Sequence, residues 1–102
     1  MLVQVQVKGL ASASRLRSFA ATKLNIALGR FSHSVQEVSM RMHDINGPER
    51  GGVDKLCRVV LTLRGNAVLV IEELGSNILQ AIERAAERLR LRVSRQLSRA
   101  HS

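Results

Sequence analysis

Aromatic side chains are almost absent from this sequence of 102 residues, which has two phenylalanines and neither tryptophan nor tyrosine. Domains that bind single-stranded RNA usually stack the bases on aromatic side chains presented by a sheet. The chain lacks the residues for such a surface. Any binding to nucleic acid is therefore expected to depend on backbone charge and shape.

The chain has a single cysteine, Cys57, so no disulfide can form within it. This usage is typical of a reducing compartment such as the cytoplasm, and we expect Cys57 to be a small buried hydrophobic residue. No uninterrupted apolar run approaches the length of a membrane-spanning helix. The first residues alternate in polarity, unlike the apolar core of a signal peptide. We expect no membrane partner.

The spacings that mark catalytic, metal and cofactor sites are also missing. No cysteine or histidine spacing resembles a zinc site. His43 and Asp44 could suggest a base and its orienting carboxylate, but adjacent strand residues point to opposite faces. The glycines of segment 45–54 are not followed by the Lys-Ser/Thr of a phosphate loop. We expect no enzyme activity, cofactor, metal or small-molecule substrate.

Acidic residues are outnumbered, with 8 Asp and Glu against 16 Lys and Arg, so the formal net charge is +8 at pH 7. Such an excess of positive charge indicates a polyanionic partner, whether RNA, DNA or an anionic membrane surface. The hydrophobic content of 45% fits a folded chain. The length suits one domain, residues 1–102.

The hydrophobic pattern predicts an α+β fold with the element order β-α-β-β-β-α. Polarity alternates with period two in four segments, which predicts strands at Leu2–Lys8, Val35–Asp44, Leu56–Arg64 and Ala67–Glu73. Helical spacing predicts helices at Arg15–Leu28 and Ser76–Arg99. We expect a two-layer sandwich with both helices on one face of a four-stranded sheet.

Local signals mark the ends of these elements. Ser12 or Ser14 is a candidate N-cap of the first helix, and Gly29 is a candidate stop. Gly65-Asn66 predicts a tight hairpin turn, and Gly75-Ser76-Asn77 predicts the cap of the second helix. The segment Ile45–Asp54, INGPERGGVD, predicts a mobile connecting loop.

Five arginines of the second helix define what we call the arginine row. At about 100° per residue they fall within a sector of roughly 80° and extend over about 22 Å. That length suits several phosphates of a nucleic-acid backbone. The apolar stripe lies beside this sector, and Glu83 and Glu87 lie on its far flank. The members of the row are Arg84, Arg88, Arg92, Arg95 and Arg99.

A charged helix face is more often merely solvated. Three observations favour a binding role here. The cations of this segment are all arginine, which forms bidentate contacts with phosphate. Glu83 has no cation three or four residues away that it could neutralise. Residues 76–102 contain six arginines and two glutamates, a net +4, which is half of the charge of the chain.

With this element order, the chain resembles the ribosome hibernation-promoting factors, the family that includes the ribosome-associated inhibitor of translation. The resemblance covers nearly the whole chain. It is carried by the opening strand, by Thr22-Lys23-Leu24 and by the second helix, from Ser76-Asn77 to Ile82-Glu83 and then at Arg88-Leu89 and Arg95. The family's aromatic residue is replaced by Leu79, and its first acid by Ser76 or Asn77.

The resemblance implies a domain that occupies the channel of the small ribosomal subunit where tRNA and mRNA lie, with its basic helices facing ribosomal RNA. It implies inhibition of translation under stress or in stationary phase. By position, Lys23, Arg88 and Arg95 match family cations, whereas Arg84, Arg92 and Arg99 depend on the helical wheel alone. The chain looks like the short form, without the dimerisation domain of the long form.

Two alternatives remain open from the sequence. The α-β-β-β-α portion is loosely similar to double-stranded RNA-binding domains, which read shape rather than sequence. The chain would then be a general module for structured RNA that does not act on whole ribosomes. In the other alternative, its basic face meets an acidic protein.

Overall fold

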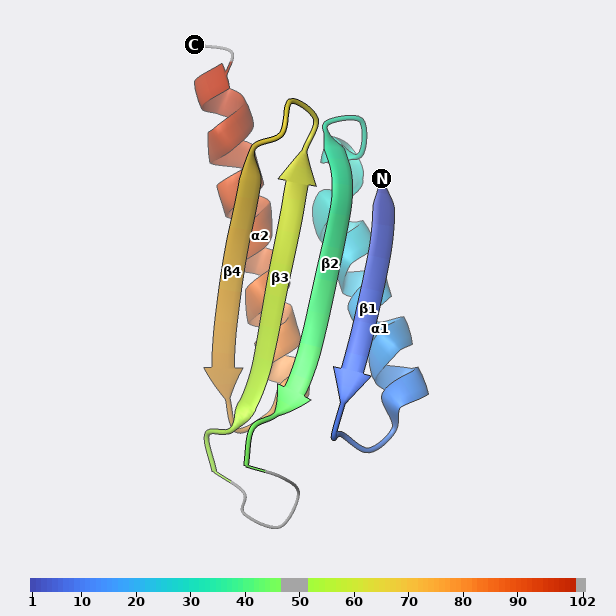
Figure 1. Cartoon of the computed structure of the whole chain (residues 1–102). Helices are drawn as coiled ribbons and strands as arrows, with labels where there is room; N and C mark the ends of the chain where they lie inside the picture. Colours follow the sequence, from blue (N-terminus) through green and yellow to red (C-terminus); the bar gives the residue numbers. More distant parts are fainter. Residues whose placement is uncertain (47–51, 101–102) are drawn as a thin grey trace.

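Both helices cover the same side of one four-stranded sheet, as the computed structural model shows (Figure 1). The structure describes residues 1–46 and 52–100. The predicted order β-α-β-β-β-α is confirmed, with a short 3-10 helix, η1, added after α1. The elements are β1 (Leu2–Lys8), α1 (Ala13–Leu28), η1 (Gly29–Phe31), β2 (Val35–Asp44), β3 (Lys55–Leu63), β4 (Val68–Gly75) and α2 (Ile78–Ala100).

The strands lie side by side in the order β1-β2-β3-β4. Strand β1 runs parallel to β2, and the two remaining pairs are antiparallel. A parallel pair needs a long crossover connection, which α1 supplies between β1 and β2. A tight turn joins β3 to β4, where Gly65 (φ 98°) and Asn66 (φ 74°) adopt the left-handed backbone that the Gly-Asn pair predicted.

The core lies between the sheet and the helices. Strand residues with the predicted inward phase are fully buried, including Val38, Met40 and Cys57. The helices contribute Leu24 and Leu28 from α1, and a stripe from α2 consisting of Ile82, Ala85, Leu89 and Val93. Burial, with a smaller contribution from the negative charge of Glu73, raises the pKa of the Cys57 thiol to about 12. Cys57 is therefore an inert core residue, as predicted.

The two helices begin differently. Asn77 caps α2 as predicted, because its side-chain Oδ1 accepts hydrogen bonds from the backbone N–H groups of Leu79 (2.9 Å) and Gln80 (3.3 Å). Ser12 occupies the N-cap position of α1, but its side chain makes no capping hydrogen bond. The reason is its left-handed backbone (φ 57°), which departs from the extended conformation of a capping serine.

Two further sequence expectations need qualification. Gly29 does end α1, but it keeps a right-handed backbone and continues into η1 instead of adopting the left-handed stop. The predicted loop Ile45–Asp54 is closed at its base by a hydrogen bond from the Ile45 N–H to the Asp54 carbonyl (2.9 Å). Its central residues, 47–51, lie outside the described part of the chain, and so does the expectation of mobility.

Candidate nucleic-acid interface

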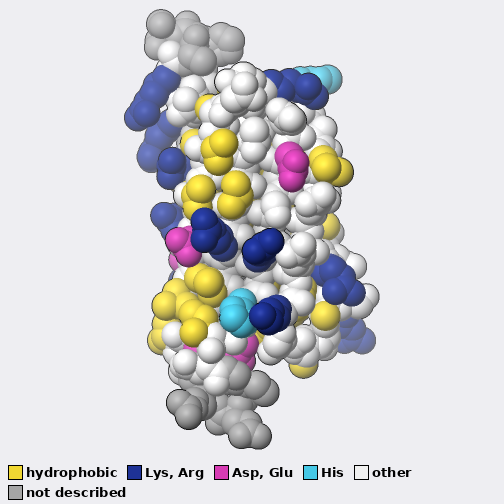
Figure 2. All heavy atoms as spheres, viewed as in Figure 1, with side chains coloured by type: hydrophobic (Ala, Val, Ile, Leu, Met, Phe, Trp, Pro, Cys, Tyr) yellow, Lys and Arg dark blue, Asp and Glu magenta, His cyan; other side chains and the backbone are white. Residues whose placement is uncertain are grey.

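The rotation of α2 about its own axis is fixed by its buried stripe, and this places the arginine row at the edge of the molecule. With Ile82, Leu89 and Val93 pressed against the sheet, the row faces sideways, toward β4. All five arginines are exposed. Figure 2 shows Lys and Arg side chains in a column along the edge beside β4. The row predicted from the helical wheel is therefore a continuous surface feature.

Arg88 is the member of the row that contacts the sheet. Its Nη1 donates a hydrogen bond to the backbone carbonyl of Glu72 (2.8 Å) and another to the Glu73 carboxylate (3.0 Å). The Glu73 side chain points to the inner face of β4, opposite Cys57 in the register with β3, and is 17% exposed. Arg88 thus fastens α2 to the edge of the sheet, although half of its side chain (51%) remains exposed.

The two ends of the arginine row differ in their acidic surroundings. Near the start of α2, Arg84 and Arg88 line a hollow together with Glu73, Glu83 and Glu87. No acidic residue follows Glu87 in the chain. The second half of the row, Arg92, Arg95 and Arg99, is therefore the more strongly positive half. We expect it to dominate attraction to phosphate.

Lys23 does not join the arginine row. Its Nζ lies 3.9 Å from the Glu83 carboxylate and 5.4 Å from the centre of the Phe19 ring, in the groove between α1 and α2. Glu87 and Arg90 line the same groove. Since the row faces β4, Lys23 is on the opposite flank of α2. The structure thus brings the five arginines together and separates the sixth predicted residue from them.

Glu87 forms an ion pair with Arg90, which is not a member of the row. Arg90 donates two hydrogen bonds to the Glu87 carboxylate, at 2.6 Å from Nη2 and 3.0 Å from Nε. This bidentate pair lowers the pKa of Glu87 and raises that of Arg90. Because Arg90 engages this carboxylate, Glu87 competes less for the neighbouring arginines of the row.

A second group of basic side chains lies on the face of the sheet that no helix covers. Lys8, Arg41, His43 and Arg58 project from this face, on β1, β2 and β3. Alternation in the sequence correctly places each of them on the polar side of its strand. It does not reveal that Arg41 and Arg58 are direct neighbours, because that depends on the register between β2 and β3.

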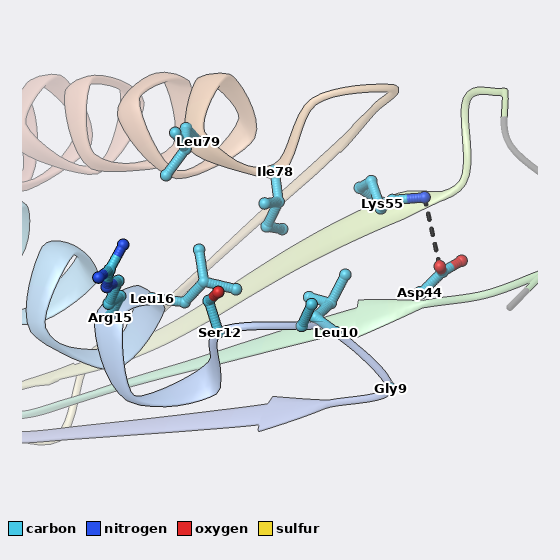
Figure 3. A pocket seen from close by; sticks show the side chains of 10 residues that line it. Gly9, Leu10, Ser12, Arg15, Leu16, Asp44, Lys55, Ile78 and Leu79 are labelled. Atoms are coloured by element: carbon cyan, nitrogen blue, oxygen red, sulfur yellow. Dashed lines mark ion pairs between the residues drawn. The ribbon is translucent and has the colours of Figure 1, made fainter. Parts of the chain in front are cut away.

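A mostly apolar hollow opens at the end of the sandwich, where β1 leads into α1 (Figure 3). Leu10 and Leu16 line it from the α1 side, and Ile78 from the start of α2. Lys55 at its rim lies 2.6 Å from Asp54 and 3.3 Å from Asp44. The hydrogen bond to Asp54 is the main cause of the raised pKa of Lys55, so this amine stays protonated and is no nucleophile.

We expect Lys55→Met to lower the melting temperature at neutral pH, because two buried carboxylates lose their ammonium partner. The contribution of Lys55 is complete below its ordinary pKa of 10.5 and is lost as the pH rises through the higher value of the folded state. Thermal unfolding of both proteins from neutral to strongly alkaline pH measures this. The gap between them should close at high pH, and a constant gap would contradict the assignment.

Within the described residues, no three His, Cys, Asp or Glu side chains are grouped so as to hold a metal ion. His43 lies on the open face of the sheet and Asp44 on the buried face, so the two do not form a catalytic pair. No helix in the described part of the chain is long and apolar enough to cross a membrane.

Comparison with known proteins gives structural neighbours but no match in sequence. Neither the protein-family models nor the curated proteins contain a match to this chain. The N-terminal domain of Protein Y from Thermus thermophilus superposes with a TM-score of 0.75 at 19% identity, over 93% of this chain and 98% of that domain. A ribosomal subunit interface protein from Coxiella burnetii superposes with a TM-score of 0.74 at 14% identity, over 96% and 99%.

At these identities the likeness establishes a shared fold, and it extends over nearly the full length of both neighbours. Both neighbours share the fold that the resemblance predicted for this chain. The resemblance predicted from the sequence is therefore confirmed in the fold.

Proposed function

We propose that this protein is a non-enzymatic ribosome-binding factor that occupies the tRNA and mRNA channel of the small subunit and inhibits translation under stress or in stationary phase. One observation carries the proposal. An exposed row of arginines runs along one edge of a fold shared with a ribosomal subunit interface protein. No cofactor or bond-making step is required, and the site of action is the cytoplasm, where ribosomes translate.

The mechanism combines electrostatic affinity with steric exclusion. Arg92 and Arg95 are exposed, and within the described residues neither forms an ion pair or a side-chain hydrogen bond. Each guanidinium can donate two parallel hydrogen bonds to a phosphate. The elongated body, 49 × 22 × 19 Å, would then exclude other ligands from the channel by its volume.

The first test is co-sedimentation with purified bacterial ribosomes and with separated subunits over a series of salt concentrations. We expect the protein to pellet with the small subunit at low salt and to be released at high salt. Four phosphate contacts would reduce the affinity about 100-fold between roughly 50 and 200 mM salt, with a linear fall of log affinity against log salt. Absence from the pellet at every salt concentration would refute the proposal.

The same experiment separates the two alternatives. Binding to an isolated RNA duplex as tightly as to the small subunit would indicate a general module for structured RNA, because shape alone would then suffice. Binding that survives nuclease digestion of the subunit would indicate an acidic protein partner. Binding that requires the intact small subunit supports the proposal.

A further inference from the structure

The open face of the sheet presents an arrangement of cations that costs stability. Arg41 on β2 and Arg58 on β3 are paired directly across two antiparallel strands, and both side chains are on the exposed face. Like charges opposite one another in a sheet are destabilising. Within the described residues, neither guanidinium makes an ion pair or a side-chain hydrogen bond.

The acid nearest in register offsets this repulsion only in part, because it is opposite Arg58 alone, whereas the partner of Arg41 on β1 is the uncharged Gln6. Glu72 is the partner of Arg58 on β4, but the two side chains form no ion pair, and the carbonyl of Glu72 accepts from Arg88 on the other side of the sheet. Two residues further along β2, on the same face, the register places His43 beside Lys8 of β1. The basic side chains thus extend from β1 to β3 as a continuous group.

The surface between these side chains is hollowed. Ser39, Arg41, Arg58 and Val60 line one hollow of about 410 Å³, and a second of about 240 Å³ lies among Gln6, Lys8, Arg41 and His43. Arg41 lines both, so the two hollows adjoin. Figure 2, which views this open face, shows the cations and a histidine close together toward its lower half.

We propose that the open face of the sheet is a second phosphate-binding surface. Arg41 and Arg58 bind one RNA phosphate between them, and Lys8 and His43 contact the neighbouring part of the RNA backbone. A phosphate between two guanidinium groups turns their repulsion into charge-assisted hydrogen bonds. The two hollows share Arg41 and form one longer depression. Such a depression suits successive phosphates of a nucleic-acid backbone better than a single ion. The occupant is RNA backbone, read without base stacking, because the face carries no aromatic side chain.

This surface and the arginine row point in different directions. The row lies on α2, in the layer behind the sheet (Figure 1). Arg41 and Arg58 are on the opposite, uncovered face of the sheet. The protein can therefore be held between two segments of RNA. The identity of that RNA as ribosomal rests on the function proposed above, whereas the capture of phosphate by Arg41 and Arg58 does not.

The test uses the variants Arg41→Gln and Arg58→Gln, singly and together, with Arg17→Gln as the matched control. Arg17 is exposed on α1 and makes no ion pair or side-chain hydrogen bond among the described residues. Each change removes one positive charge. Binding to the small subunit and to a fluorescent RNA duplex is measured against salt, and thermal unfolding is recorded for every variant.

We expect each single sheet variant to weaken binding by up to about 5- to 10-fold near 0.1 M salt and to lower the salt slope by up to about one unit. Because both arginines hold the same phosphate, the double variant should lower the slope by about one unit in all, while its melting temperature is unchanged or raised, since a repulsion has been removed. The Arg17→Gln control should bind nearly as the wild type does.

Two results would overturn the inference. One is wild-type affinity and slope in the double variant, and the other is a melting temperature well below that of the control, which would assign the pair a structural role. The measurement with the RNA duplex makes this test independent of the proposed function, because it involves no ribosomal subunit. Failure of the wild type to bind subunits, together with duplex binding that depends on Arg41 and Arg58, would refute the ribosomal role and retain the phosphate surface.

Discussion

Replacing Arg92 and Arg95 together by Glu should abolish co-sedimentation with the small subunit and leave the melting temperature close to that of the wild type. Both side chains are exposed on the acid-free half of α2. Reversing two charges removes two phosphate contacts and adds two repulsive groups at the same positions. We expect the affinity to fall by more than about 60-fold near 0.1 M salt, since the loss of two contacts alone accounts for about that much and the new repulsion adds to it.

The structure decides which arginines to change. Arg88 matches a family cation by position, but it also holds α2 to β4 through Glu73 and the carbonyl of Glu72. A charge reversal there would set a carboxylate against Glu73 and destabilise the fold. Loss of binding in such a variant would not separate contact with RNA from damage to the protein. Arg92 carries no such contact within the described residues.

The control for this experiment matches the change in charge. Arg95→Glu and Arg17→Glu each change the net charge by two units, and both arginines are exposed on a helix. If overall charge governs binding, the two single variants should weaken it equally. If the arginine row is the interface, Arg95→Glu should be much the weaker binder. A folded Arg92→Glu/Arg95→Glu protein that pellets normally would eliminate the row as the interface.

Periodicity was sufficient to predict the elements and the face that each buries. The alternation in Leu2–Lys8 and Val35–Asp44 predicted two strands with these same bounds. The apolar stripe of α2 predicted its burial, and the position of the stripe fixes where the arginines point. These features depend on residues close together in the chain, so a helical wheel or a strand alternation captures them.

Contacts between residues that are far apart in the sequence could not be predicted from helical or strand periodicity. Glu73 precedes Arg88 by 15 residues and belongs to a different element, so no helical spacing relates them. Lys23 was selected because it matches a family cation by position, but the packing of α1 against α2 places it beside Glu83. The juxtaposition of Arg41 and Arg58 required the register of β2 and β3, which alternation leaves undetermined.

The second large effect is expected in stability, for Leu89→Ala. Leu89 is 0% exposed and lies in the middle of the α2 stripe, between the helix and the sheet. Truncating a buried leucine removes its apolar contacts and leaves a cavity, at a cost of about 2–5 kcal/mol in the free energy of unfolding. A domain of this size is stable by roughly 5–15 kcal/mol, so the loss is a large fraction of the total.

The same helix supplies a matched control, because Leu91 is 39% exposed. We expect Leu91→Ala to change the free energy of unfolding by less than about 0.5 kcal/mol, since little apolar surface is lost and alanine favours a helix. Urea titration of both variants, with an unchanged slope against denaturant, measures the difference. Equal effects would mean that Leu89 is not the inward residue. The rotation of α2 would then differ from the one described, and the arginine row could not face the edge beside β4.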